Sequence, residues 1–494
     1  MLAGVGGRFL SFVDSYADHF QSYRHNVSDK ARQYACGLMQ AGSRKNMDRM
    51  AEVVPEANSR NLQQFLTHSK WDYRGVMDHV ARDADKLLGD GRDACLLIDE
   101  SGFAKQGKSS VGVSRQWLGR LGKVDNGQVA VFGALANGRF AVPIDARLYL
   151  PEQWTDDPKR CEKAGVPEEE RGFRTKPELA LEIVRHARKG GLRFGWVGAD
   201  AGYGKGPGFC SALDEMGQTF MVDVHSDFHV YLKDPEPYLP QKANDRGRPI
   251  TKYQTDQKSI EVRQLVNSLP AQRWKTLTLR RTTRGVLRVR SCRVKVYVWD
   301  GESEKVQCWT LITTKSLGTN PDTKISLTNA PNRTTLKRLG WMQRQRYWVE
   351  RAFEDAKSEC GMADYQVRKW RAWHHHTALV MMAMLFMLSE RIFHKDTYPL
   401  LSCADIEVLL ARFLPRRDVT EEEVMLQLEH RHRKRKKAIE SHARCQSENA
   451  EPSSRSDFVD PNYEVKLIGD IIQPFNSWIP CLCNHSERFK QNDQ

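Results

Sequence analysis

The stretch Cys95-Leu96-Leu97-Ile98-Asp99-Glu100-Ser101 decides the fold class, because it is a continuous apolar run that ends abruptly in acidic and small polar residues. A short apolar run of this kind predicts a buried strand. A second run, Phe194 to Ala199, ends in the same way at Asp200. Open sheets place their sites at the carboxyl ends of strands, so Asp99 and Asp200 are candidate functional residues.

The chain between the two runs predicts an antiparallel hairpin. Gln128 to Leu135 and Arg139 to Leu148 are strand candidates, and Ala136-Asn137-Gly138 joins them. Asn-Gly is a strong signal for a tight hairpin turn. Both arms of the hairpin are therefore expected in the same sheet as the two buried runs.

A well-delimited helix and a further strand complete this region. Thr175 and Glu178 form a capping box, and Gly190-Gly191 marks the end of the helix. Another strand is expected at Phe220 to Val224. The order of strand, hairpin, helix, strand, helix and strand predicts an α/β fold, a mixed sheet with helices packed on it.

The flanking regions differ in character. Residues 1 to about 90 lack alternating β runs and predict a small helical domain, whereas residues 226 to 340 are Pro- and Gly-punctuated β segments. Within the latter, the alternation of Val286 to Trp299 changes parity near Ser291-Cys292, which predicts a bulge or bend. Helical periodicity resumes at about Arg344, continues to Phe393 and returns in parts of the remaining chain.

Three charged residues share one stripe of the helix expected from Arg344 to Lys357. At about 100° per residue, Glu350 lies about 40° and Lys357 about 20° from Arg346. The neighbouring face is apolar and can pack on the sheet, which would hold the stripe at its edge. Glu354 lies at about 80° on the same helix and is the alternative acid.

Each of these features also has a plain structural explanation. Aspartate before Ser-Gly or Ala-Gly is ordinary turn chemistry, which suits both Asp99 and Asp200. Arg346 and Glu350 can form a solvated i,i+4 pair, which contributes only a few tenths of a kcal/mol. Taken singly, none of them establishes a site.

Composition narrows the class of partner. The chain of 494 residues has 76 Lys+Arg against 62 Asp+Glu, a net charge of +14, and 40% hydrophobic residues. Such a globular, basic protein is expected to bind a polyanion. Of this surplus, 18 basic and 4 acidic residues lie between Val262 and Val349, and Arg288, Arg290, Arg293 and Lys295 stand at its centre. We therefore expect these four residues to contact the polyanion.

Membrane binding is the other option for a basic protein. The most apolar stretch, Ala378 to Leu388, is too short to cross a bilayer, and we find no signal peptide. The interpretation is a cytoplasmic protein with no membrane partner. Cys481-x-Cys483, with His485 nearby, lies in a polar tail and has residue types that can bind a metal ion; chance clustering is the alternative explanation.

The ordered set of motifs resembles the DDE transposases of bacterial insertion sequences, in the group with a Tyr-x2-Arg-x3-Glu-x6-Lys signature. Arg346-x3-Glu350-x6-Lys357 fits this signature, whereas the tyrosine position is Gln343. Further stretches resemble the same group: Asp99-Glu100-Ser101-Gly102-Phe103-Ala104-Lys105, Arg147-Leu148-Tyr149-Leu150-Pro151, Phe173-Arg174-Thr175-Lys176 and Ala199-Asp200-Ala201-Gly202-Tyr203-Gly204. The resemblance spans roughly residues 30 to 395.

The resemblance implies a ribonuclease H-like core in which Asp99, Asp200 and Glu350 bind two Mg²⁺ ions, with Mn²⁺ as a substitute. Hard cations require oxygen ligands, and a metal pair suits in-line phosphoryl displacement. The implied activity is cleavage at transposon ends followed by strand transfer into target DNA, of the cut-and-paste type. By the same resemblance, Arg346 and Lys357 contact DNA phosphates beside the metals.

The resemblance also implies a division of the chain. Residues 1-90 are expected as a helical DNA-binding domain, 91-225 as the first part of the core and 226-340 as a β-rich insertion domain. Residues 341-395 would close the core with the catalytic glutamate, and 396-494 would form a helical C-terminal region and tail. The expected partner is double-stranded DNA, with a homodimer assembled on it. The resemblance also implies a bacterial protein associated with the nucleoid.

Other functions remain open. A descendant that binds DNA as a regulator and no longer cuts it would keep the same fold. A nuclease that uses His374-His375-His376 as metal ligands would need alternating histidines on a strand, whereas these open an apolar helix. A non-catalytic structural role would make the carboxylate pattern a coincidence, and it would be supported if Asp99 and Asp200 lay more than about 10 Å apart, beyond what two bridged metals allow.

Overall fold

The computed structural model describes residues 2–42, 44–240, 251–282, 285–318 and 321–449. Its contacts divide the chain into a compact unit, Met1–Asp418, and a second unit that begins at Val419. In the second unit, α15 (Glu421–Asn449) carries the basic run Arg431–Lys437 on a largely exposed helix. Cys481, Cys483 and His485 lie outside the described residues.

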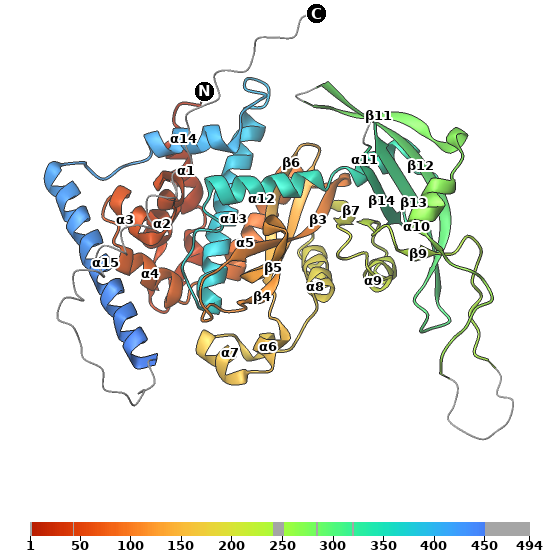
Figure 1. Cartoon of the computed structure of the whole chain (residues 1–494). Helices are drawn as coiled ribbons and strands as arrows, with labels where there is room; N and C mark the ends of the chain where they lie inside the picture. The colour runs from red at the N-terminus through yellow and green to blue at the C-terminus, as the bar shows by residue number, and fades with distance from the viewer. Residues whose placement is uncertain (1, 43, 241–250, 283–284, 319–320, 450–494) are drawn as a thin grey trace, which may run out of the picture. The chain divides into compact units, whose positions relative to one another are not determined.

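One mixed sheet of ten strands organises the first unit (Figure 1). Its order is β11-β12-β13-β14-β8-β7-β3-β5-β4, with β6 also paired to β5. The strands are β3 (Asp90–Ala104), β4 (Ser114–Leu118), β5 (Lys123–Asn137), β6 (Phe140–Leu148), β7 (Phe194–Ala199), β8 (Phe220–Asp223), β11 (Lys275–Thr282), β12 (Gly285–Trp299), β13 (Val306–Ser316) and β14 (Thr323–Thr328). The segment expected as an insertion therefore continues the same sheet, through the antiparallel pairing of β14 with β8.

The strands predicted from the two buried runs lie side by side. β3 pairs with β7 in parallel, and β7 pairs with β8 in parallel. On its other edge β3 pairs with β5, which forms the predicted hairpin with β6 across Gly138-Arg139, with Gly138 at φ 61°. The mixed α/β character expected from the sequence is confirmed.

Helices cover both faces of this sheet. The helices are α1 (Val5–Asp14), α2 (Ser28–Gln40), α3 (Met47–Val53), α4 (Ser59–Thr67), α5 (Tyr73–Leu88), α6 (Glu152–Thr155), α7 (Pro158–Ala164), α8 (Lys176–Lys189), α9 (Gly208–Glu215), α10 (Val262–Ser268), α11 (Leu336–Gln343), α12 (Tyr347–Glu359), α13 (Trp370–Phe393) and α14 (Cys403–Phe413). Short strands β1 (Gln21–Ser22), β2 (His25–Asn26), β9 (His229–Val230) and β10 (Ile260–Glu261) form two small ribbons.

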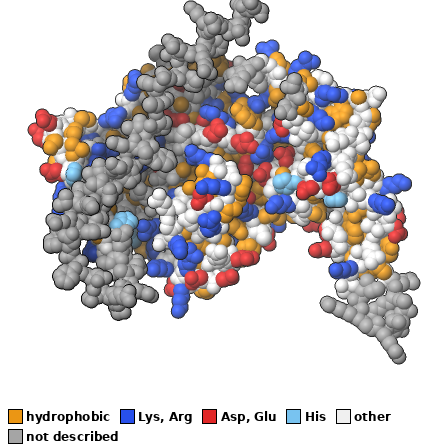
Figure 2. Space-filling model, in the orientation of Figure 1, with side chains coloured by type: hydrophobic (Ala, Val, Ile, Leu, Met, Phe, Trp, Pro, Cys, Tyr) orange, Lys and Arg blue, Asp and Glu red, His pale blue; other side chains and the backbone are white. Residues whose placement is uncertain are grey.

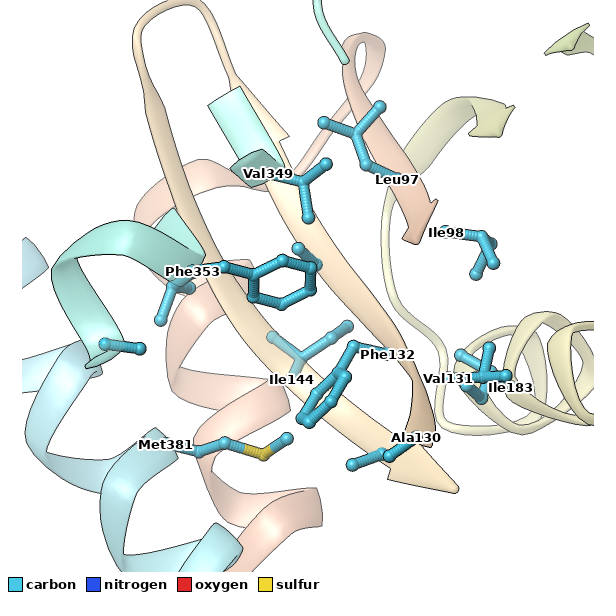
Figure 3. Packing of buried hydrophobic residues seen from close by; sticks show 14 of the residues in the cluster. Leu97, Ile98, Ala130, Val131, Phe132, Ile144, Ile183, Val349, Phe353 and Met381 are labelled. Atoms are coloured by element: carbon cyan, nitrogen blue, oxygen red, sulfur yellow. The ribbon is translucent and has the colours of Figure 1, made fainter. Parts of the chain in front are cut away.

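Close-up packing shows how the two faces differ (Figure 3). Phe353 of α12 meets Phe132 of β5 edge to face at 5.2 Å between ring centroids, with Met381 of α13 on the same side. On the opposite side, Ile183 of α8 approaches so closely that a Cβ added at Gly133 would lie 2.6 Å from its Cγ2 atom. A glycine on β5 thus admits the helix whose capping box the sequence predicted and the structure confirms.

Helix α13 is the most apolar element. Among the described residues it is the one helix long and apolar enough to cross a membrane, and 78% of its most apolar window is buried in the protein. It packs against α5, α2, α4 and β6, which accounts for its composition. The helix extends beyond the apolar stretch Ala378 to Leu388 at both ends. Its buried residues include His374, His375 and His376, which precede that stretch.

Two sequence expectations about local geometry were wrong. β12 and β13 pair without a register shift from Val289 to Trp299, so no bulge lies at Ser291-Cys292, and the irregularity is in β11 between Thr278 and Arg280. Burial changes face along β12 because the covering elements change, from α11 at one end to β9 at the other. The helix expected from Arg344 starts at Tyr347, after a break that separates α11 from α12.

Candidate active site

Three aspartates lie in one row across neighbouring strands. The parallel pairing of β3 with β7 ends at Ile98 and Ala199, so Asp99 and Asp200 come next on the two strands. In the same way Ala199 pairs with Val222, which brings Asp223 beside Asp200. Neighbouring strands are about 4.8 Å apart. This spacing is well below the separation of about 10 Å between Asp99 and Asp200 that would support a purely structural role.

Asp99 differs in detail from the expectation that it ends a strand. β3 continues to Ala104 along β5, and it is only the pairing with β7 that stops before Asp99. Because side chains alternate along a strand, Asp99 shares its face with its pairing partner Phe132, the face that α12 covers. The side chain of Asp99 is therefore largely buried, at 12% exposure.

Helix α12 adds a fourth acid and a shared cation. The Arg346 guanidinium lies 3.2 Å from Asp99 (Nη1 to Oδ2), 3.5 Å from Asp223 (Nε to Oδ2) and 2.7 Å from Glu350 (Nη2 to Oε1). Arg346 occupies the position just before α12, and Glu350 follows one turn later on the same stripe, as their spacing predicted. Carboxylates from β3, β8 and α12 thus converge on one guanidinium.

Burial and charge together set the acidity of these groups. Burial raises the pKa of Asp99 to about 7, against the attraction of Arg346, and the neighbouring Asp200 and Glu350 raise it further. Burial also raises the pKa of Asp223, and the hydrogen bond from Ser326 and the charge of Arg346 oppose this. Crowded carboxylates of this kind favour a bound cation.

Hydrogen bonds from nearby backbone N–H groups hold Asp99 and Asp200 in place. The backbone N–H of Glu100 donates to Asp99 at 2.8 Å, and that of Gly202 donates to Asp200 at 2.9 Å. Asp200 therefore also caps a turn, as the plain structural explanation expected. The two explanations are compatible, since the turn bond occupies a single oxygen of Asp200.

Lys357 lies beside the acidic row, two turns beyond Glu350 on α12. Its ammonium is 5.8 Å from the Phe103 ring centre. Burial lowers its pKa, Arg120 adds to this, and Asp99 opposes it. Lys357 is therefore within electrostatic range of Asp99.

The alternative acid, Glu354, is placed elsewhere. It pairs with Arg351 at 3.2 Å, and its side chain is 69% exposed. Glu350, in contrast, shares Arg346 with Asp99 and Asp223. The arrangement of side chains favours Glu350 as the acid that completes the group.

Sequence reasoning missed Asp223 and its supports. The strand expected at Phe220 to Val224 contains this aspartate near its end, the same signal that singled out Asp99 and Asp200. Asp223 accepts a hydrogen bond from Ser326 of β14, and Ser326 in turn accepts one from Gln343 at 2.8 Å. Lys324 is also in range, since Asp223 and Glu350 act on its charge.

The four basic residues of β12 do not form one surface. Alternation along the uninterrupted pairing with β13 places Arg288 and Arg290 on one face and Arg293 and Lys295 on the other. Through Ile312 and Ser326, the pairing register puts Arg293 on the face of Asp223. On the face visible in Figure 2, Lys and Arg side chains are scattered among acidic and apolar ones.

The His374-His375-His376 run is not a metal site. Each ring bonds to the protein interior: His374 bonds to the Trp370 carbonyl and His376 to the Tyr34 hydroxyl, while the carbonyls of Leu66 and Trp71 face the two nitrogens of His375 and one of them accepts its single N–H. All three are buried. Their role is packing and hydrogen bonding within the core.

A comparison with protein families decides the class. Residues 16–286, more than half of the chain, match the model of the DDE superfamily endonucleases. The chain belongs to this family. The matched range of this DDE endonuclease contains Asp99, Asp200 and Asp223 and ends before Arg346 and Glu350.

A curated relative points in the same direction. The DDE endonuclease is 32% identical over 228 residues to the "probable transposase for insertion sequence element IS701" of Microchaete diplosiphon. The aligned part covers 45% of this chain and 56% of that protein. The chain thus spans little more than half the length of the relative it matches.

Proposed function

We propose that this DDE endonuclease is a transposase that cuts DNA at the ends of a mobile element and joins those ends to target DNA. The observation that carries the proposal is the convergence of carboxylates from β3, β8 and α12 on Arg346, with Asp200 beside them. Asp99, Asp200 and Glu350 are the proposed catalytic residues. The family match and the transposase relative support the same activity.

The proposed core is ribonuclease H-like. Its five strands are β6, β5, β3, β7 and β8, in which the two parallel pairs carry the aspartates and α12 brings the glutamate. The segment 226–340 is the proposed insertion, attached through β14. The helices before residue 90 are the proposed region for recognising transposon ends.

The donor set suits divalent cations. Carboxylate oxygens are the ligands that Mg²⁺ and Mn²⁺ prefer, and Asp99, Asp200 and Glu350 would hold them. Among the described residues, no three Asp, Glu, His or Cys side chains are close enough to hold an ion as they stand, since Arg346 lies between the acids. When bound, two such ions activate the attacking oxygen and stabilise the leaving one.

The chain's own residues position the DNA. Arg346 and Lys357 flank Glu350 on α12 and are proposed to pair with phosphates of the strand being cut, as guanidinium and ammonium groups do. Arg293 and Lys295 lie on the same sheet face as the carboxylates and would extend this contact. The proposed partner is double-stranded DNA, bound by a homodimer because two ends must be brought together.

The test compares two glutamates on one helix. Glu350→Gln should lower Mg²⁺-dependent cleavage of a duplex carrying the element's terminal inverted repeats by at least about a hundredfold, since bound ions supply several kcal/mol of transition-state stabilisation. Glu354→Gln, one turn further along α12 and exposed, should cleave at nearly the wild-type rate. Cleavage is followed on denaturing gels.

Two results would overturn the assignment. Equal losses in both variants would remove the distinction between Glu350 and Glu354, and unchanged cleavage by Asp99→Ala or Asp200→Ala would remove the site altogether. Sequence-specific binding by the wild type with no cleavage in either metal would instead favour a DNA-binding regulator.

A further inference from the structure

One guanidinium satisfies acids from three separate elements. Arg346 approaches Asp99, Asp223 and Glu350 at 3.2, 3.5 and 2.7 Å, and Asp200 also acts on its charge. Its side chain is 20% exposed. Lys324 and Lys357 are also within electrostatic range of these acids, and Arg346 is the basic residue that pairs directly with three of them.

The guanidinium and a divalent cation require the same oxygens. A metal held by Asp99 and Glu350 would need the atoms that now face Arg346, so both cations cannot be accommodated in the present arrangement. Arg346 stands at the break between α11 and α12, where the backbone is not within a helix. A long side chain at this point can turn away while α12 and Glu350 remain in place.

We propose that Arg346 is a displaceable counter-ion, which occupies the carboxylates in the free protein and is drawn away by a DNA phosphate, so that the divalent cation binds only when DNA is present. This inference rests on the proposed function and adds to it an order of assembly. Arginine suits both states, because its planar fork pairs as well with a phosphate as with a carboxylate.

Linkage makes the inference quantitative. If DNA raises the affinity for the metal through Arg346, the metal must raise the affinity for DNA by the same factor. Coupling between two sites is typically about 5- to 150-fold, and we expect about tenfold here. Without Arg346 the coupling should disappear, because the carboxylates are then open in the absence of DNA.

Asp223 keeps the counter-ion in place. Its other oxygen accepts from Ser326, which leaves one oxygen for Arg346. Asp223 is therefore a positioning residue for the guanidinium. Its substitution by Asn should weaken the hold on Arg346 and raise metal affinity in the absence of DNA, in the same direction as loss of Arg346 itself.

The experiment is Mn²⁺ binding to the full chain, measured by electron paramagnetic resonance of the free ion, with and without a short duplex. Wild type should bind Mn²⁺ about tenfold more tightly with the duplex. Arg346→Gln should bind about tenfold more tightly than wild type without DNA and gain nothing from the duplex. Arg351→Gln is the matched control, because Arg351 lies on the same helix and pairs with Glu354 and Asp355.

Folding of the variant is checked by thermal unfolding. Arg346→Gln should unfold at a lower temperature than wild type, and Mn²⁺ should restore it, because a ligand that binds only the folded state stabilises it. Arg346→Lys keeps the charge without the fork and should show an intermediate affinity for Mn²⁺. If Arg346→Gln does not fold, Mn²⁺ binding by Arg346→Lys, with and without the duplex, replaces it as the test.

The outcomes separate the two proposals. If Arg346→Gln binds Mn²⁺ no more tightly than wild type while Asp99→Ala still abolishes cleavage, the counter-ion proposal is wrong and the transposase site stands. If no variant binds Mn²⁺ under either condition, both proposals fall. An identical gain in Arg351→Gln would show a general effect of charge and would also overturn the counter-ion proposal.

Discussion

Gln343 occupies the position of the tyrosine in the Tyr-x2-Arg-x3-Glu-x6-Lys signature. In this protein it forms hydrogen bonds to the neighbouring strands. Its side-chain oxygen accepts from the Thr314 hydroxyl at 2.5 Å, and its nitrogen donates to Ser326 at 2.8 Å. Ser326 then donates to Asp223. An amide can accept and donate at once in this way, and it links β13 and β14 to the carboxylate row.

Replacing this amide should destabilise the fold. Gln343→Leu removes the bonds that Gln343 makes to the buried hydroxyls of Thr314 and Ser326, and an unsatisfied buried group costs roughly 1–3 kcal/mol. The free energy of unfolding, from urea denaturation, should fall by this amount with an unchanged m-value. Gln33→Leu, which removes a single bond to Lys30, is the control and should change it by less than about 0.5 kcal/mol. Equal stabilities of the two variants would contradict this role of Gln343.

At this scale, sequence patterns predicted part of the proposed site. An apolar run followed by aspartate marked Asp99 and Asp200, and helical spacing marked Arg346 with Glu350. Asp223 was missed because it lies inside a strand expected to run on to Val224. The contacts that support it come from Ser326 and Gln343, which are distant in the chain and carry no local signal.

Helix α13 shows what three histidines do in a buried setting. Burial lowers the pKa of His374, His375 and His376 to about 3 each. Trp71 stacks on His375 at 3.8 Å between ring centres. The three rings are therefore neutral in the folded protein well below the pH at which an unfolded histidine takes up a proton.

The fold should be sensitive to acid for this reason. Unfolded histidine has a pKa near about 6.5, so the stability that these residues contribute is complete above about pH 6.5 and is lost as the pH falls toward about 3. Uptake of one proton by each ring corresponds to a slope of about 4 kcal/mol per pH unit in this window. Urea unfolding between about pH 7 and pH 4.5 measures it.

A single substitution should change that slope. His375→Phe keeps the stacking on Trp71 and removes one titrating group, so about one proton fewer should be taken up on unfolding. A slope unchanged in His375→Phe would mean that other groups dominate acid unfolding.

Elements with strong end signals were the ones that the sequence predicted well. The Asn-Gly hairpin, the capping box of α8 and the buried runs of β3 and β7 were all confirmed. The start of α12 and the bulge in β12 were wrong. Both depend on which elements cover a segment, and that information comes from the packed structure.

The strand pairing of the whole sheet determines which Lys and Arg side chains a bound DNA duplex can contact. The excess of Lys and Arg between Val262 and Val349 is evident from the sequence, but strand alternation divides it between two faces. Arg293 and Lys295 share a face with the carboxylates, whereas Arg288 and Arg290 do not. A duplex that reaches the proposed site along one face cannot contact both pairs equally.

Charge reversal of each pair tests this division. Arg293→Glu with Lys295→Glu should weaken DNA binding strongly and lower the slope of log affinity against log salt by roughly 0.9 for each phosphate that the protein no longer neutralises. Arg288→Glu with Arg290→Glu should have a much smaller effect. Filter binding over a range of salt concentrations measures both, and equal effects would show that DNA contacts both faces or wraps the sheet.

The position of α13 has a consequence for how the protein is made. This helix packs against α2, α4 and α5, which precede it in the chain and therefore leave the ribosome before it, and against β6. Trp71 and Tyr34 complete their contacts with it through His375 and His376. These earlier helices must therefore wait for α13 to be synthesised, with apolar surface exposed in the meantime. A product that stops before Trp370 would leave this surface uncovered, and it should be recognised by chaperones and proteases rather than accumulate as a shorter, DNA-binding protein.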